Sequence, residues 1–133
     1  MAYEESLRSI TLNADATLAV YTGVPGQPGS ADPHGGKQYH FVKVTGVHQV
    51  GLAAATGAVV GVLQNKPQNA GNAATVGIRG VSKVVSDVAI TAADPIFSSA
   101  DGQAAKTGTG PQVGVALTTT AAPGELVSVL LTL

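Results

Sequence analysis

The side chains that most often carry chemistry are few in this sequence, and they are not grouped. Three histidines, His34, His40 and His48, are six and eight residues apart, and these spacings match no common metal-binding pattern. Two of them could form a metal site with an acid such as Asp32, but surface or edge-strand positions explain them better. We therefore expect no metal site.

The acidic and small residues also form no recognisable catalytic set. Asp87, Asp94 and Asp101 are seven residues apart, without the short acid spacing and closing glutamate of a calcium loop. Residues 108–114, GTGPQVG, resemble a phosphate-binding loop but lack its lysine and lead into an extended segment. Catalysis needs a nucleophile or an acid–base group with an orienting partner. We therefore expect no enzyme activity and no cofactor.

Composition limits the possible partners. Charged residues make up 11% of the chain, against about 25% in an ordinary soluble domain. The net charge of −1 supplies no basic field for nucleic acid and no polybasic membrane anchor. No apolar run approaches the roughly 18 residues that span a bilayer, and no signal peptide is evident. We expect a protein made in a cytoplasm, with much of its surface covered in an assembly.

Short valine-rich runs between glycines and prolines predict an all-β domain. The chain has 17 Gly and 7 Pro and no sustained helical period. We expect a small β-barrel or sandwich of about nine to eleven short strands. Residues 1–38 are expected to form an extended N-terminal arm, with strands and a Gly/Pro-rich loop over residues 24–38. Residues 39–133 are expected to form the body of this single domain.

An internal repeat supports the β prediction. Residues 57–80 align without a gap on residues 110–133. Each copy is expected to form strand, loop and strand with one apolar face, although Leu130 breaks the alternation. The shared positions are then scaffold, and the polar loop over residues 64–70 is the part free to serve as a contact surface. Six of the 24 aligned pairs are identical: Gly57/Gly110, Val60/Val113, Gly61/Gly114, Val62/Val115, Gly71/Gly124 and Val76/Val129.

The segments GVLQNKP, GVSKV, VAITAADPIFSSADGQA and VGVAL…PGELVSVLL resemble the capsid decoration, or cement, proteins of tailed bacteriophages. The resemblance runs from about residue 41 to the end of the chain. Ala93 stands where the family tends to have glycine. The resemblance implies a β-rich protein on the outer surface of the virion head that binds the major capsid protein and stabilises the shell. It also implies homotrimers at three-fold and quasi-three-fold positions, and no catalysis.

The same resemblance directs attention to possible contact residues. Tyr3, Leu7 and Ile10 could anchor an N-terminal arm in a groove of the shell or add a strand to a neighbour. Lys66 and Arg79 are candidate polar contacts, because charges are scarce and both residues lie in or beside the repeat. A solvated surface position is the simpler explanation for these two.

Two other functions fit parts of the sequence. A tail or baseplate β-domain of a virion would have the same composition. A carbohydrate-recognition β-sandwich would need an exposed aromatic platform, for which Tyr21, Tyr39 and Phe41 are the candidates. Packing in a core or an interface explains these aromatic residues better.

Overall fold

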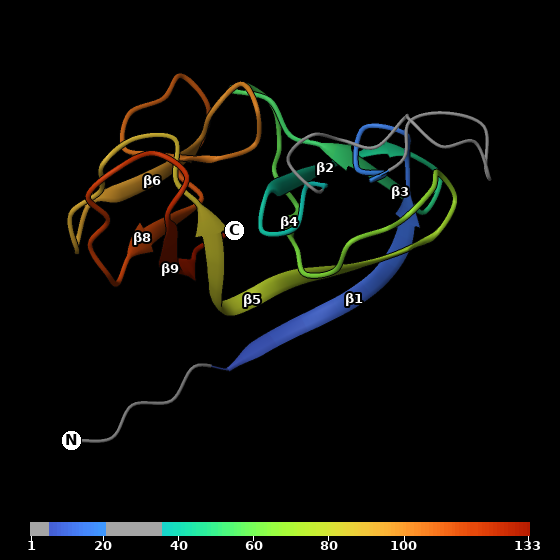
Figure 1. Ribbon diagram of the computed structural model, residues 1–133, viewed down its shortest axis with the longest axis horizontal. Coiled ribbons are helices and arrows are strands. Elements are labelled where there is room, and N and C mark those ends of the chain that lie inside the picture. Colours follow the sequence, from blue (N-terminus) through green and yellow to red (C-terminus); the bar gives the residue numbers. More distant parts are fainter. Residues whose placement is uncertain (1–5, 21–35) are drawn as a thin grey trace.

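The protein is built from β-strands joined by turns and loops (Figure 1). The computed structural model describes residues 6–20 and 36–133, and within these ranges it contains nine strands and no helix. The all-β prediction is therefore confirmed. The strands are β1 (Leu7–Ala14), β2 (Phe41–Gly46), β3 (Gln49–Leu52), β4 (Gly61–Leu63), β5 (Ala73–Val85), β6 (Pro95–Ser98), β7 (Ala104–Ala105), β8 (Gly114–Ala116) and β9 (Leu126–Leu131).

The strands form two rings that share the long strand β5. The first ring runs β1-β3-β2-β4-β5 and closes through the pairing of β1 with β5. The second runs β5-β9-β8-β6-β7 and closes through a parallel bridge between Ser86, which follows β5, and Ala104. The two rings appear as two lobes in Figure 1, with β5 bending from one into the other. The expected barrel is thus a ring-like sheet rather than one regular barrel.

The internal repeat is confirmed by strand register. In the first ring, Val62 of β4 lies opposite Gly77 of β5. In the second, Val115 of β8 lies opposite Leu130 of β9, so both members of the pair are shifted by 53 residues. A side chain supports each loop in the same way: Asn65 Oδ1 accepts a hydrogen bond from the Thr75 amide, and Thr118 Oγ1 accepts one from the Ser128 amide, both at 2.9 Å.

The repeat extends over the whole fold, beyond the part visible in the sequence. Strand β1 and the second part of β5 are equivalent, and so are the hairpins β2–β3 and β6–β7. Each of these elements keeps the register of its counterpart. Residues that lie opposite each other on paired strands in the first unit correspond to opposite residues in the second unit. The corresponding pairs, first unit before second, are Ile10–Val76 and Ser82–Val129, Leu12–Ala74 and Val84–Val127, Val44–Val50 and Ser98–Ala104, and Val42–Gly61 and Ile96–Gly114. The described chain is therefore two copies of one five-stranded unit.

Each unit buries its own aliphatic cluster. The clusters use equivalent positions: Leu18 and Ile90, Val42 and Ile96, Leu63 and Ala116, Ala74 and Val127, Val76 and Val129. The second cluster also takes in Phe41, Ala53 and Val62 from the first unit. Burial of these three side chains joins the two units, because apolar surface removed from water stabilises the contact.

The glycine of each V-G-V segment lies where two backbones approach closely. A Cβ on Gly61 would lie 2.3 Å from the carbonyl oxygen of Gly77, and a Cβ on Gly114 would lie 2.6 Å from that of Leu130. Gly77 and Leu130 are themselves equivalent positions. The glycine shared by both copies is thus explained by the same backbone contact in both rings.

We expect Gly61→Ala and Gly114→Ala each to lower the free energy of unfolding by about 1–3 kcal/mol, because the added methyl group overlaps a backbone oxygen that cannot rotate away. Urea denaturation followed by circular dichroism would measure this change. Gly71→Asn is the control: its φ of 88° is left-handed and its Cβ direction is open, and asparagine tolerates that conformation. Alanine variants as stable as the control would contradict the prediction.

Candidate interaction surfaces

Two of the three histidines, His40 and His48, lie in the described part of the chain, and they are in different surroundings. His40 is buried, and its Nδ1 lies 3.1 Å from the carbonyl oxygen of Gln38. His48 is exposed in the turn between β2 and β3. His34 and Asp32 lie outside the described residues. Within residues 6–20 and 36–133, no three His, Cys, Asp or Glu side chains are grouped closely enough to hold a metal ion.

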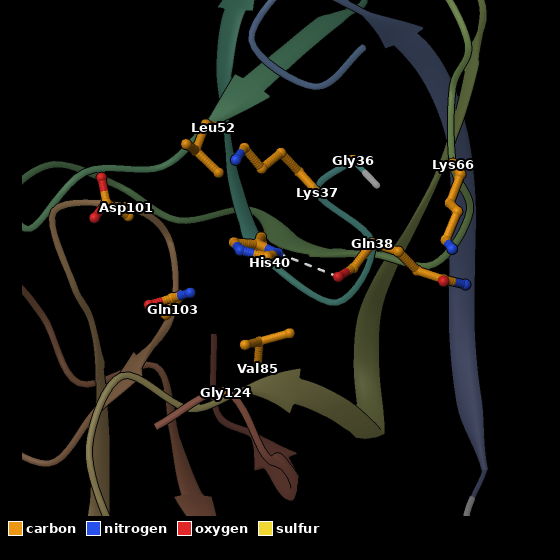
Figure 2. A pocket seen from close by; sticks show the side chains of 10 residues that line it. All are labelled: Gly36, Lys37, Gln38, His40, Leu52, Lys66, Val85, Asp101, Gln103 and Gly124. Atoms are coloured by element: carbon orange, nitrogen blue, oxygen red, sulfur yellow. Dashed lines mark hydrogen bonds between the residues drawn. The ribbon is translucent and has the colours of Figure 1, made fainter. Parts of the chain in front are cut away.

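A hollow of about 600 Å³ lies between the two units (Figure 2). Its wall combines polar and apolar side chains, and Gln38 Nε2 donates a hydrogen bond to the Gln64 carbonyl oxygen there, at 2.9 Å. The described lining side chains include no serine, threonine or cysteine. The hollow is therefore a seam whose lining residues come from both units. Its lining consists of Gly36, Lys37, Gln38, His40, Leu52, Lys66, Val85, Asp101, Gln103 and Gly124.

The contact residues expected at the N-terminus differ in their surroundings. Tyr3 lies outside the described residues. Leu7 is half-buried and covers Gly77, where an added Cβ would lie 2.9 Å from both Leu7 methyl carbons. Ile10 is 42% exposed. Both Leu7 and Ile10 belong to β1, which pairs with β5 from Leu7 to Asn13. These two residues are therefore held rigidly on the body of the fold.

The two candidate polar contacts are both exposed but lie on different elements. Lys66 is in the loop between β4 and β5, at the seam between the units. Arg79 is on β5, directly opposite Arg8 of β1, which is exposed as well. Like charges directly opposite on a sheet are destabilising. The Arg8–Arg79 pair thus favours a role other than folding.

The polar loop over residues 64–70 is partly structural. Gln64 Nε2 donates to Ser82 Oγ at 2.8 Å, which ties the first unit to the second. Asn65 Nδ2 donates to the Ala73 carbonyl oxygen at 2.9 Å, and Pro67 is buried. The exposed remainder of the loop includes Lys66 and Gln68. Gln64 and Asn65 are therefore bonded to other parts of the fold, and Gln68 Nε2 donates to the Lys66 carbonyl oxygen within the loop at 3.3 Å; the sequence alone did not show these contacts.

No aromatic platform is present among the described residues. Phe41 is fully buried and joins the two units. Tyr39 follows the seam residue Gln38 and has a positive φ of 65°. Tyr21 lies outside the described residues. Phe41, the most deeply buried of the described aromatic side chains, therefore packs in the core.

Sequence reasoning named Ile10 as a contact residue but missed the other exposed aliphatic side chains. Leu130, which breaks the apolar alternation of β9, is 42% exposed, and Leu117 after β8 is 46% exposed. The broken alternation was the available signal. The exposed large aliphatic side chains of the described residues are Ile10, Val44 and Val47 in the first unit, and Leu117, Leu126, Leu130 and Leu133 in the second.

Comparison with solved structures finds a chain of similar fold. The crystal structure of the head fiber gp8.5 N base of bacteriophage phi29 superposes with a TM-score of 0.55. The alignment covers 96% of this chain and 95% of the phi29 chain at 16% sequence identity, so it shows a shared fold. No curated protein sequence matches the chain. In the described part of the chain, no helix is long and apolar enough to cross a membrane.

A family model described as phage cement protein matches residues 34–131. The match includes β2 to β9, and therefore the second unit together with most of the first. It confirms the family resemblance seen in GVLQNKP, GVSKV and the closing segment. On this evidence the chain belongs to the phage cement protein family.

Proposed function

We propose that this protein binds the outer surface of a phage capsid, contacts the major capsid protein and stabilises the shell. It does so as a homotrimer at three-fold and quasi-three-fold positions. The observation that carries the proposal is the match of the cement protein family over residues 34–131. The phi29 neighbour is the base of a head fiber, which favours a position on the head over one in the tail or baseplate.

The surface of the protein supports a role in binding. Charged residues are scarce, at 11% of the chain, and several large aliphatic side chains are exposed. Scarce charge together with exposed large aliphatic side chains is typical of surfaces that are covered in an assembly. A shell also presents many equivalent positions, so modest contacts per copy add up when the copies are linked. The protein thus acts by binding alone, without a chemical step.

We expect the purified protein to bind mature heads that lack it and to occupy three-fold positions. Cryo-electron microscopy of decorated and undecorated heads would show the added density. Decorated heads should release their DNA at a higher temperature, because a ligand that binds only the intact shell stabilises it. Binding to tails or baseplates instead would contradict the proposed position. Binding without any rise in the release temperature would contradict shell stabilisation.

The Arg8–Arg79 pair provides a more local test. We expect the double variant Arg8→Ser/Arg79→Ser to fold with unchanged or slightly greater stability, by up to about 0.5 kcal/mol, because a like-charge pair is removed. Its occupancy on heads should fall, and the fall should be larger at low salt, where exposed charges act most strongly.

The double variant Lys83→Ser/Lys106→Ser is the matched control, since both lysines are exposed and lie on the second unit. Its occupancy should match that of the wild type. If the control and the arginine variant lose occupancy equally, general charge rather than the Arg8–Arg79 pair accounts for binding.

A further inference from the structure

The two units of the chain contact each other through different surfaces. The first unit contributes a row of neighbours across three strands: Phe41 on β2, Val62 on β4 and Gly77 on β5. All three are buried, and Phe41 and Val62 enter the core of the second unit. Gln64 extends the contact by donating to Ser82 Oγ on the second unit, at 2.8 Å. This contact is heterologous, because each unit uses a different surface.

A heterologous contact between two equivalent units leaves one surface of each kind open. On the second unit, the row equivalent to Phe41, Val62 and Gly77 is Pro95, Val115 and Leu130, joined by the same strand pairings. Pro95 and Leu130 are exposed, and Val115 is half-buried. The second unit therefore presents an uncovered copy of the surface that the first unit buries.

The other open surface is on the first unit. Ser82 lies opposite Val129, and its equivalent, Ile10, lies opposite Val76 in the same register. Ser82 is 3% exposed because Gln64 and its neighbours cover it, whereas Ile10 is 42% exposed. The position that receives the intrachain contact on the second unit is thus uncovered on the first.

The residues at the two open surfaces are complementary. The Gln64 amide donates to the Thr75 carbonyl oxygen at 2.7 Å, and the Leu117 amide donates to the Ser128 carbonyl oxygen at the same distance. Leu117 is therefore the equivalent of Gln64. Inside the chain the contacting pair, Gln64 and Ser82, is polar. At the open surfaces the corresponding pair, Leu117 and Ile10, is aliphatic on both sides, and both side chains are exposed.

We propose that copies of this protein associate by repeating their internal contact, so that the surface with Pro95, Val115, Leu117 and Leu130 of one copy covers Ile10 of the next. The inference rests on the proposed self-association and names the surfaces that form it. A heterologous contact gives a ring of identical subunits where the rotation between them closes, and an open filament where it does not; the proposed homotrimer is the closed case. A second copy fits this surface because the chain already contains the matching partner.

Cysteine cross-linking tests the pairing directly, because the chain contains no cysteine. Ile10→Cys and Leu117→Cys are made as separate proteins, mixed at high concentration and oxidised, both in solution and on heads. We expect a disulfide-linked dimer that contains one copy of each variant, identified by mass spectrometry. The double variant in one chain should give linked oligomers, seen on a non-reducing gel and absent after reduction.

Leu117→Cys mixed with Ala89→Cys is the matched control, since Ala89 is exposed on the segment between β5 and β6. We expect that mixture to form at least ten times less of the mixed dimer. If Ile10→Cys and Leu117→Cys form no mixed dimer in solution or on heads, or no more than the control, the proposed contact is wrong. Occupancy of the heads by the uncross-linked protein would show that capsid binding stands even then.

A charge exchange gives a second measurement that needs no oxidation. Ile10→Lys and Leu117→Glu should each weaken self-association at least tenfold, as measured by sedimentation, because each places one charge against an aliphatic side chain. The double variant in one chain should recover association, since every contact then pairs lysine with glutamate. Circular dichroism would verify that all three proteins fold. Single variants that associate as the wild type does would overturn the proposal.

Discussion

The pairing of β5 with its neighbours is the interaction on which the rest of the structure depends. Its first part hydrogen-bonds to β1 and β4, and its second part hydrogen-bonds to β9. Gly80 allows the strand to pass from one ring to the other, with a left-handed φ of 102° and with its Cβ position only 2.0 Å from the carbonyl oxygen of Ser6. No other residue satisfies both constraints, because any side chain would meet the Ser6 backbone. One strand thereby fixes the relative position of the two units.

Much of the fold could be predicted from the sequence, because backbone requirements leave local marks. The V-G-V glycines, the later glycine and the alternating valines revealed the strand–loop–strand units that the structure shows as β4–β5 and β8–β9. The wider repeat could not be seen, because register is a property of the backbone while side chains adapt to their surroundings. Ile10 and Ser82 occupy the same position in the two units, yet one is exposed and the other is covered. The two residues therefore differ in type, and the sequence does not show that their positions are equivalent.

The contact surfaces were less predictable for a related reason. Lys66 and Arg79 were selected because charges are scarce, and the structure places both at the surface. Leu117 and Leu130 resemble core residues in the sequence, because leucine in a strand is most often buried. Their exposure follows only from the closure of the second ring, which turns Ala116 and Val129 inward and leaves the alternate positions outside. A single sequence does not show which face of a strand the closed ring leaves uncovered.

The different chemistry of the two kinds of contact has a thermodynamic explanation. Inside the chain, β5 holds the units together, so the contact between Gln64 and Ser82 forms at a high effective concentration and needs little affinity of its own. A contact between separate copies must also offset the loss of translational and rotational freedom. Burying aliphatic surface contributes about 25 cal/mol of favourable free energy per Å² of apolar area. A polar pair contributes less, because its members give up hydrogen bonds to water when they form a hydrogen bond to each other. Leucine and isoleucine at the open positions, where the covered positions have glutamine and serine, are therefore what a repeated contact between copies requires.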